Sequence, residues 1–390
     1  MGFMSEYINR KLGIEDLENE LIKLIKTYNK LRGAYLVVYA GAIGKQIPDI
    51  PLNMDDYYAI YDMLRGIESK KLDFYIETPG GSGEAAEEIG RFIRDKFENI
   101  VFVISGESKS AGTILALSGD EILMTRSGSL GPIDAQIRIG RTVGSAYDYM
   151  EWINEKKVEA QKNKMLNPFD ATMVAQISPS ELKGVYNSLE FAKDIVKEWI
   201  SKYKFKDWTV TETRKIPVTD EMKRKKAEEI AKELTNHGRW RSHGRSLKID
   251  DLESIGLRIK RLDEDETLAE IVYRIQTIIR LIFSSGTNYK IIATENDRLF
   301  KQAISAGMTR PHPRNEIDLL EIDVQCQKCG RSHKIYAKFV NKAQIDIDYK
   351  KKGIPPFPKD NKLICDCGFE MDLSGIQKDV ESKTGKKIIR

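Results

Sequence analysis

The chain has 390 residues, 41% of them hydrophobic and 31% charged, which is long enough for two or three globular domains with sizeable cores. Its 63 basic and 59 acidic residues give a net charge of +4, a balance that does not indicate a nucleic-acid partner. The N-terminus lacks an apolar core of signal-peptide length, and the most apolar short run, residues 35–43, falls short of the roughly 18 residues that span a bilayer. We therefore expect a cytoplasmic protein that does not enter a membrane.

The first third of the chain alternates between two hydrophobic periods. Residues 14–31 have the spacing of an amphipathic helix, and the segments after them switch between strand-like and helix-like patterns. Strands that alternate with helices predict parallel pairing and an α/β domain, which we bound at residues 33–305, after an N-terminal helix in residues 1–32. The predicted strands are 35–39, 72–77, 100–105 and 121–125, and the predicted helices between them are 55–65, 84–97 and 110–117.

The rest of the chain is mostly helical and ends in a separate module. A late strand is predicted at 289–293, with a helix from there to Ala306. Prolines then mark a linker over residues 306–319, a cysteine-containing module follows, and a basic tail closes the chain. The helices predicted between residues 146 and 285 are 147–164, 170–175, 179–202, 221–234 and 267–285, together with a short cap-and-helix unit within 248–260 that ends at Gly256. The last two segments are 320–375 and 376–390.

Two glycines, Gly80 and Gly81, directly follow the predicted strand that ends at Glu77. Paired glycines allow backbone N–H groups to point into a site without a side chain in the way. A tetrahedral oxyanion needs two donors of this kind, so the pair is a candidate oxyanion hole. The alternative is an ordinary turn between a strand and a helix.

Ser110 follows the next strand and opens a helix that begins with Ala111. A helix N-terminus carries partial positive charge and free N–H groups, so Ser110 is a candidate nucleophile and the N–H of Ala111 a candidate second oxyanion donor. The alternative is that Ser108 or Ser110 only caps the helix. The segment is not a GxSxG nucleophile elbow, because Ser108 stands where the first glycine would be.

A serine nucleophile needs a base, and the chain has four histidines. His333 lies inside the cysteine module and His312 in the proline-containing linker, which leaves His237 and His243. Asp134, in a Gly/Pro loop after the predicted strand 121–125, would orient the imidazole and stabilise its charge; the alternative is a capping or turn role.

This order of motifs resembles the Clp-protease/crotonase superfamily: a Gly-Gly loop, a strand, Ser-Ala-Gly opening a helix, and a GSLGPI segment at residues 128–133. The GSLG part is also similar to signal peptide peptidase A. The longer match over roughly residues 30–300, including residues 131–136 and 238–243, is similar to the serine dehydrogenase proteinase family, a Clp-related branch. The resemblance implies a repeated ββα core with added helices. It also implies a triad in which Ser110 is the nucleophile, Asp134 the orienting acid and His243 the base.

The chain departs from typical Clp peptidases in one respect. Their base histidine lies in the segment that residues 133–136 occupy here, and this segment has no histidine. The base then comes from His243, from its rival His237, or from a lysine, as in signal peptide peptidase A. A lysine base needs burial to lower its pKa, and the Lys/Glu-rich helix that carries the candidates has an exposed pattern. The candidate lysines are Lys156, Lys157, Lys162 and Lys164.

All four cysteines lie in the C-terminal module, as the pairs Cys326/Cys329 and Cys365/Cys367. Four thiolates suit a closed, tetrahedral, structural zinc site, so we predict a zinc-ribbon-like module, although the second pair is CxC and not CxxC. An iron–sulfur site and free thiols are the alternatives. The module would serve recognition or assembly, and the sequence does not choose between a protein and a nucleic acid as its target.

Together these features predict a serine peptidase that forms an acyl-enzyme. The family resemblance adds an expectation of a homo-oligomer that acts on peptides or unfolded protein segments. The chain has no GxxxxGK[ST] motif, so ATP-driven unfolding would need a separate partner. The alternatives are a crotonase-type acyl-CoA enzyme and a non-catalytic scaffold that binds partners through the zinc ribbon.

Overall fold

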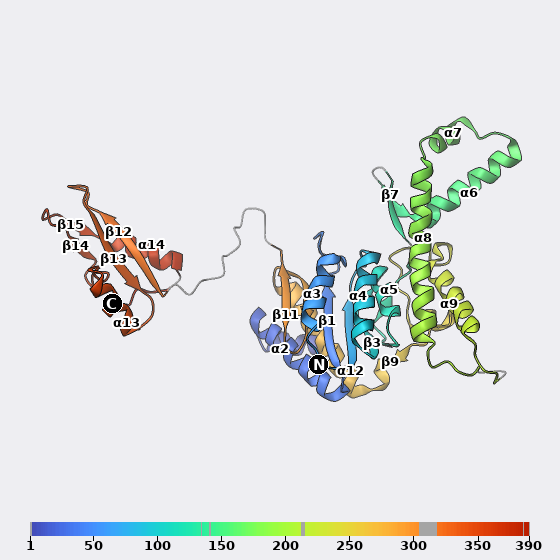
Figure 1. Cartoon of the computed structure of the whole chain (residues 1–390), viewed down its shortest axis with the longest axis horizontal. Helices are drawn as coiled ribbons and strands as arrows, with labels where there is room; N and C mark the ends of the chain where they lie inside the picture. The colour runs from blue at the N-terminus through green and yellow to red at the C-terminus, as the bar shows by residue number, and fades with distance from the viewer. Residues whose placement is uncertain are drawn as a thin grey trace. The chain divides into compact units, whose positions relative to one another are not determined.

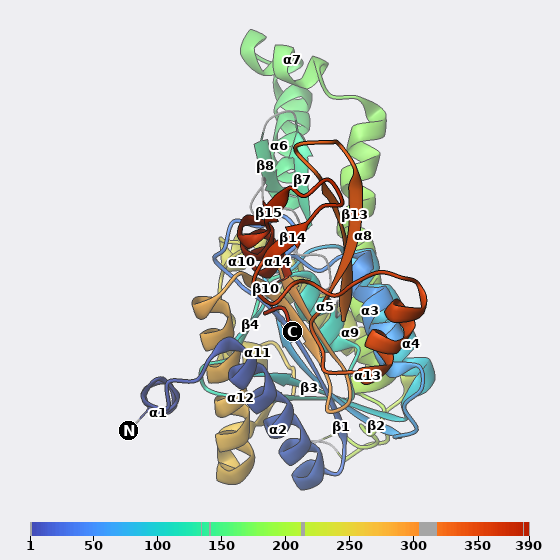
Figure 2. The same cartoon turned by 90° about the vertical axis from the view of Figure 1, so that its left-hand side faces the viewer.

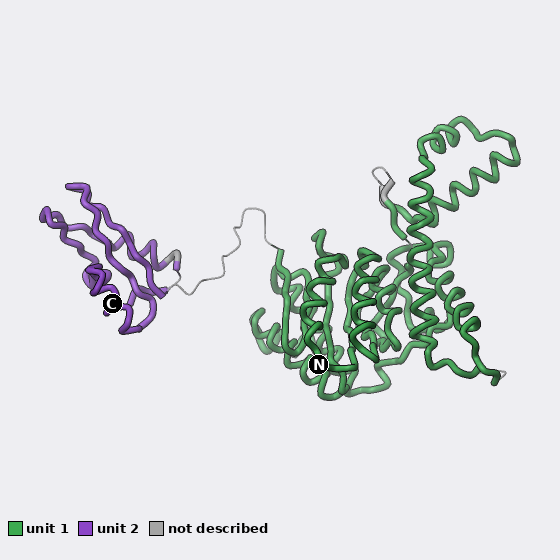
Figure 3. The backbone as a smooth tube through the Cα atoms, viewed as in Figure 1, with its two compact units in different colours: residues 1–303 green, residues 304–390 purple. Residues whose placement is uncertain are grey.

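The computed structural model describes residues 2–133, 135–139, 142–211, 215–303, 318–384 and 386–389. The chain divides into two compact units, residues 1–303 and residues 304–390 (Figure 3). Each unit has its own core and is described by itself. Among the described residues, no helix is both long enough and apolar enough to cross a membrane.

The first unit is built on a seven-stranded mixed sheet in the order β11-β10-β1-β2-β3-β5-β9 (Figure 1). The central strands are parallel, whereas β10 pairs antiparallel with β1 and β11 antiparallel with β10. This confirms the predicted α/β fold, and the two antiparallel strands at one edge add to the predicted parallel pairing. The strands are β1 (Tyr35–Gly41), β2 (Lys71–Glu77), β3 (Asn99–Ile104), β5 (Glu121–Met124), β9 (Lys260–Arg261), β10 (Asn288–Ala293) and β11 (Arg298–Gln302).

Helices cover both faces of the sheet (Figures 1 and 2). Side chains alternate between the two faces along each strand, so Val37 packs in one core and its neighbour Val38 in the other. Both cores are fully buried, which fixes the register of the central strands. One face is covered by α3 (Met54–Leu64), α4 (Gly83–Lys96), α5 (Ala111–Leu117), α8 (Pro179–Trp199) and α9 (Asp220–Thr235), and the other by α2 (Ile14–Arg32) and α12 (Glu266–Ser285).

The helix predicted from residue 294 to Ala306 is wrong, because residues 294–303, the described part of that stretch, contain strand β11 and no helix. A tight turn in which Thr294 N–H donates to Asp297 O at 2.8 Å sends the chain back along β10. The apolar residues Leu299 and Phe300 are too few to distinguish a short edge strand from a helix by spacing alone.

A second, much smaller set of β contacts lies beyond the ends of β2, β3 and β5. Thr78 pairs with Ser108, β4 (Glu107–Ser108) pairs with β6 (Ser129–Leu130), and Leu130 pairs with Leu247. Backbone hydrogen bonds of 2.8 Å from Thr78 N to Glu107 O and from Leu247 N to Leu130 O join the outer members. We call these four segments, around residues 78, 107–108, 129–130 and 247, the site ladder.

An arm of helices extends from the same unit, away from the sheet (Figure 1). A short hairpin leads into it, and the C-terminal part of α8 brings Val196 and Trp199 back into the core. The arm comprises β7 (Gln136–Ile139), β8 (Thr142–Ser145), α6 (Ala146–Asn163), α7 (Pro168–Ala175) and the first part of α8, which continues into a π-helix (Ile200–Lys204). The remaining short elements of the unit are α1 (Phe3–Asn9), α10 (His237–Trp240), α11 (Ile249–Ser254) and a 3-10 turn (Leu262–Glu264).

The second unit contains two antiparallel hairpins and two helices around a small core that includes Ile335, Ala337 and Leu373. The predicted basic tail begins inside the last helix, and residues 304–317, which contain most of the predicted linker, lie outside the described residues. The elements are β12 (Leu319–Gln325), β13 (Ser332–Lys338), α13 (Ala343–Lys351), β14 (Lys362–Ile364), β15 (Glu370–Asp372) and α14 (Ser374–Thr384).

Candidate active site and candidate metal centre

Ser110 sits at a sharp turn between β4 and α5. Its backbone has φ 47° and ψ −113°, a conformation that costs free energy for any residue with a Cβ and that persists only where the surroundings enforce it. The surroundings here are two backbone hydrogen bonds of Lys109, from its N–H to Thr78 O at 3.0 Å and to its carbonyl from Gly112 N at 2.8 Å. Although Ser110 is the N-cap residue of α5, its side chain makes no capping hydrogen bond.

Gly80 and Gly81 have φ values of 113° and 142°, which side chains rarely tolerate. A Cβ on Gly80 would lie 2.8 Å from Ser110 Cβ, and one on Gly81 would lie 2.2 Å from Leu52 O. Leu52 N–H donates to Gly80 O at 2.7 Å, and Ser82 N–H donates to Leu52 O at 2.9 Å. The glycine loop is therefore held between Ser110 on one side and the Leu52 backbone on the other, with no room for a side chain.

The Leu52 segment is itself anchored by a buried ion pair. Lys290 Nζ lies 2.7 Å from Asp56 Oδ2, both side chains are fully buried, and the same ammonium donates to Pro51 O at 3.1 Å. Burial lowers the pKa of Lys290, and the charge of Asp56 opposes that shift. Because breaking a buried pair leaves a charge without its partner, this contact fixes the wall behind Gly81.

Two backbone N–H groups of the predicted oxyanion hole are available. The N–H of Gly80 donates to Thr78 Oγ1 at 3.3 Å. Within the described ranges, the N–H groups of Gly81 and Ala111 donate to no other residue. These two groups can therefore bind a substrate oxygen without breaking a protein hydrogen bond.

The predicted residues Ser110, Gly80, Gly81, Ala111 and His243 line one cavity of about 680 Å³. The structure thus brings His243, which is half-buried, to the same space as the serine more than a hundred positions earlier in the chain. No hydrogen bond joins Ser110 Oγ to any of the residues that the structure describes, and catalytic contacts of this kind often tighten only with substrate. Asp134 lies outside the described residues, between the cavity-lining residues Ile133 and Ala135.

The rival bases lie elsewhere. His237 Nε2 is 3.4 Å from Asp148 Oδ2, and His237 is not among the residues that line the Ser110 cavity. None of the candidate lysines, Lys156, Lys157, Lys162 or Lys164, lines it either. Hydrogen bonds to Asp170 and Glu159 raise the pKa of Lys156, which is the opposite of what a lysine base needs.

Part of the cavity wall comes from α8, which the sequence motifs did not indicate. Phe191 and Ala192 face the cavity together with the polar residues Asn187 and Ser188. A Cβ on Gly83 would lie 3.1 Å from the Phe191 ring, so the helix packs closely on the glycine loop. Helical spacing predicted α8, but no local pattern in it indicates that this face meets residues 80–83 rather than another part of the fold.

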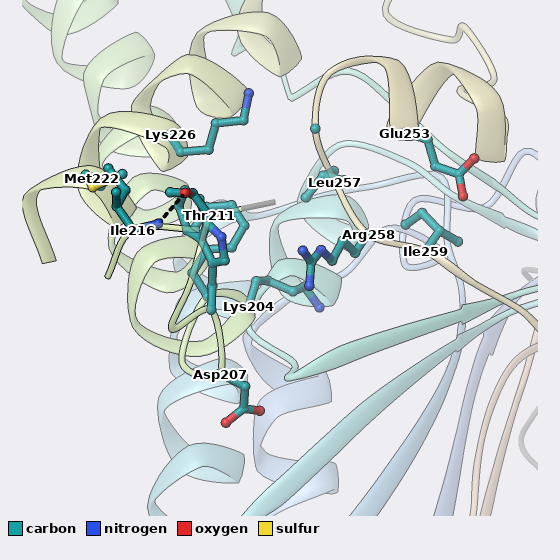
Figure 4. Close-up of a pocket in the computed structure, with 13 residues that line it drawn as sticks. Lys204, Asp207, Thr211, Ile216, Met222, Lys226, Glu253, Leu257, Arg258 and Ile259 are labelled. Atoms are coloured by element: carbon teal, nitrogen blue, oxygen red, sulfur yellow. Dashed lines mark hydrogen bonds between the residues drawn. The ribbon is translucent and has the colours of Figure 1, made fainter. Parts of the chain in front are cut away.

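A separate cavity of about 750 Å³ lies near the C-terminal end of α5, and none of the predicted site residues lines it (Figure 4). Its cationic residues are Lys204, Lys226 and Arg258. Lys204 Nζ donates to Ala116 O, the carbonyl near the end of α5, at 3.2 Å. Burial lowers the pKa of Lys204 to about 7. The helix that begins at Ser110 therefore ends against a lysine that titrates near neutral pH.

The four cysteines of the second unit form one cluster. All four Sγ atoms lie within 4.8 Å of one another, with 3.7 Å between Cys326 and Cys367 and 3.5 Å between Cys329 and Cys365. Tetrahedral zinc with four sulfur ligands requires S···S separations of about 3.8 Å. Gly330 and Gly368 follow the two pairs with φ values of 75° and 81°, and each donates its N–H to a cysteine carbonyl of its own turn. The cluster therefore fits a structural metal.

A family model for "ClpP-like SDH-type serine proteinase" matches residues 50–216, which contain both the glycine loop and Ser110. This segment of the chain is therefore similar to the ClpP-like SDH-type serine proteinase family. The match confirms the family resemblance and the assignment to serine proteinases. His243 lies beyond the matched residues, so its role does not follow from the family match.

Two uncharacterized proteins of Methanocaldococcus jannaschii are similar to the chain. One is 27% identical over 203 residues, which are 51% of this chain and 56% of the relative. The other is 24% identical over 223 residues, which are 56% of this chain and 63% of the relative. The chain thus spans less than two thirds of the length of each relative.

Two solved structures of a membrane-bound stomatin-specific protease also resemble the chain, one of a serine-to-alanine variant and one of a lysine-to-alanine variant with a substrate peptide. Each alignment has 13% sequence identity and covers 56% of this chain. It covers 76% of the first structure with a TM-score of 0.32, and 74% of the second with a TM-score of 0.33. We transfer nothing about the site from likenesses this distant.

Proposed function

We propose that the first unit is a serine peptidase in which Ser110 is the nucleophile and His243 the general base. The observation that carries the proposal is that Ser110, His243 and the open N–H groups of Gly81 and Ala111 all meet in one cavity. The strained backbone of Ser110 supports it, because strain of this kind is concentrated at functional sites. The family pattern adds Asp134 as the residue that orients His243.

The reaction follows from these positions. Ser110 Oγ attacks the scissile carbonyl carbon while His243 takes the hydroxyl proton, and the carbonyl oxygen becomes an oxyanion that Gly81 and Ala111 stabilise. His243 then gives its proton to the leaving amine as the C–N bond breaks, and an acyl-enzyme ester remains. Water attacks the ester, passes a proton to His243, and Ser110 regains its proton as the acid product leaves.

The substrate class we propose is peptides or unfolded protein segments. The cavity combines apolar wall residues, Ile114, Ile133 and Phe191, with the polar Asn187 and Ser188, which suits a peptide side chain beside a polar backbone. Assembly into a homo-oligomer, and a separate ATPase that delivers folded substrates, remain proposals from the family pattern.

Labelling with a fluorophosphonate probe tests the nucleophile. The probe phosphonylates an activated serine with loss of fluoride, and peptide mass spectrometry locates the adduct. We expect an adduct on Ser110 that is absent in Ser110→Ala, whereas Ser108→Ala, which changes a buried hydroxyl nearby, retains it. An adduct whose formation depends on one of the lysines in place of His243 would support a Ser–Lys dyad. No adduct on the folded wild-type protein would refute the proposal.

We propose that the cysteine cluster holds one structural zinc ion through Cys326, Cys329, Cys365 and Cys367. The sulfur separations carry this proposal, and a closed four-thiolate site leaves no position for catalysis. Metal analysis should find about one zinc per chain. Cys326→Ser should lose the metal and unfold the second unit, whereas Lys328→Ala, a change within the same turn, should keep both. Retention of one zinc by Cys326→Ser would contradict the assignment.

A further inference from the structure

Lys109 precedes the proposed nucleophile, but its side chain does not enter the cavity. The residue is only 5% exposed, and its ammonium group contacts oxygen atoms of two other segments. Lys109 Nζ lies 2.7 Å from Ser246 Oγ and 3.2 Å from Arg245 O, and it is 3.4 Å from Ser129 Oγ. Two of these contacts are on the loop that carries His243.

The glycine at position 131 explains how the lysine stem reaches that loop. A Cβ on Gly131 would lie 2.8 Å from Lys109 Cδ and 3.2 Å from Lys109 Cα. The stem therefore crosses directly over Gly131, and Ser129 of the same GSLG segment accepts a hydrogen bond from its ammonium. The GSLG segment, which resembles a family motif, thus packs directly against the side chain of Lys109.

The loop around His243 is also held on its C-terminal side. After it, Leu247 joins the site ladder by two backbone hydrogen bonds to Leu130, of 2.8 and 3.1 Å. The residues between, Arg245 and Ser246, are exposed to solvent. The contacts of Lys109 therefore restrain, from the inner side, a part of the loop whose side chains are otherwise exposed to solvent.

We propose that Lys109 is a positioning residue that ties the backbone carrying Ser110 to the loop carrying His243, and so determines where the imidazole lies in the cavity. The catalytic consequence rests on the proposed serine-peptidase function, whereas the placement of the loop does not. A lysine acting as a base would have to present its amine to Ser110 inside the cavity, whereas Lys109 does not line the cavity and its amine contacts Ser246 and Arg245 O.

The chemistry of the contacts supports a tether rather than an ion pair. The ammonium has three N–H donors and meets neutral oxygens, with no carboxylate among its hydrogen-bond partners. Burial lowers the pKa of Lys109, and the charge of Glu107 opposes that shift. Replacing the ammonium leaves Ser246 and Arg245 O free to hydrogen-bond to water, so we expect the loop to move and not the core to collapse.

The test compares Lys109→Met, which keeps most of the stem and removes the donors, with Lys45→Met. Lys45 is a matched control because its ammonium also binds backbone carbonyls, those of Gly286 and Asn288, far from the site in sequence. Ser246→Ala is a second test variant that removes one acceptor on an exposed residue and leaves the core untouched. Hydrogen exchange of residues 241–247 reports the loop without requiring any activity.

For Lys109→Met we expect faster exchange in residues 241–247 and fluorophosphonate labelling of Ser110 slowed roughly ten- to hundred-fold. We also expect the pH profile of labelling to lose the limb that reports the general base, which simple loss of folded protein would not cause. Ser246→Ala should change both measurements in the same direction but less, and Lys45→Met should change neither.

Unchanged exchange in both Lys109→Met and Ser246→Ala would overturn the proposal, whatever the labelling rate. Faster exchange with an unchanged labelling rate and pH limb would overturn its catalytic part. If the wild-type protein is not labelled and Lys109→Met still loosens the loop, the tether stands and the serine-peptidase function falls.

Discussion

The seven-stranded sheet and the site ladder are built in opposite ways. The centre of the sheet consists of apolar strands buried on both faces, such as β1, in which every residue is buried. The ladder consists of one- or two-residue pairings among loop segments. The sheet brings three strand ends to one edge, but the ladder places the glycine loop, the serine and the histidine loop relative to one another. Stability and site geometry therefore depend on different residues, which mutations can separate.

Replacing each of the two candidate histidines by glutamine should give the largest difference in labelling rate. We expect His243→Gln to slow labelling of Ser110 by about 10²- to 10⁴-fold, the usual contribution of a general base. His237→Gln removes a contact with the exposed Asp148 and a ring contact with Tyr147, for which we expect about 0–1 kcal/mol in stability and no change in labelling. Labelling rates and thermal melts of both variants check this. If His237→Gln slowed labelling and His243→Gln did not, His237 would be the general base.

Gly81→Ala tests the edge where sheet and ladder meet. The new Cβ would collide with the Leu52 backbone, so we expect the N–H of residue 81 to be misplaced and labelling to fall by about 10²- to 10³-fold. Gly44→Ala is the control, because Gly44 also has a positive φ of 102° but open space around it. It should cost about 1–2 kcal/mol in stability and leave labelling intact. Equal labelling by both variants would argue against a donor role for Gly81.

Gly131→Ala tests the ladder alone. The added methyl group must displace the Lys109 stem, which we expect to cost about 1–3 kcal/mol and to slow labelling of Ser110 roughly ten-fold. Gly184→Ala, in a helix with nothing within 4 Å of the new Cβ, should be neutral or slightly stabilising. If Gly131→Ala destabilises the protein without affecting labelling, the ladder contributes stability and not site geometry.

The smallest expected effect on labelling comes from Lys204, which lies at the C-terminal end of α5, away from the site ladder. Because the pKa of Lys204 is about 7 in the folded protein, well below the 10.5 of an unburied lysine, the folded state binds fewer protons between these pH values. The free energy of unfolding should therefore rise as pH increases from about 7 towards 10. Lys204→Met should flatten that rise, and Lys202→Met, on an exposed neighbour, should not.

Urea denaturation at several pH values measures this slope. Tryptophan fluorescence is suited to it, since all four tryptophans lie within residues 1–303 and report on the first unit alone. The rate at which the probe labels Ser110 should be the same in Lys204→Met as in the wild-type protein. An unchanged pH slope in Lys204→Met would show that this lysine is not the group responsible.

The same contrast explains what the sequence could predict. The sheet strands and the motif Gly80-Gly81 are local patterns, so their positions follow from apolar runs and from the special conformations of glycine. Lys109 stands in a short polar run, where its burial depends on Gly131 and on a loop far along the chain. No local period reports such a contact. The short edge strand β11 was mistaken for a helix for a related reason, since its pairing with β10 is tertiary.

The most direct test of the account is a crystal structure of the fluorophosphonate-labelled protein. We predict the phosphonyl group on Ser110 Oγ, its oxygen within hydrogen-bond distance of the N–H groups of Gly81 and Ala111, and the imidazole of His243 beside Ser110 Oγ. Lys109 Nζ should still contact Ser246. An adduct whose oxygen faces solvent, or a lysine in the place of His243, would contradict the account.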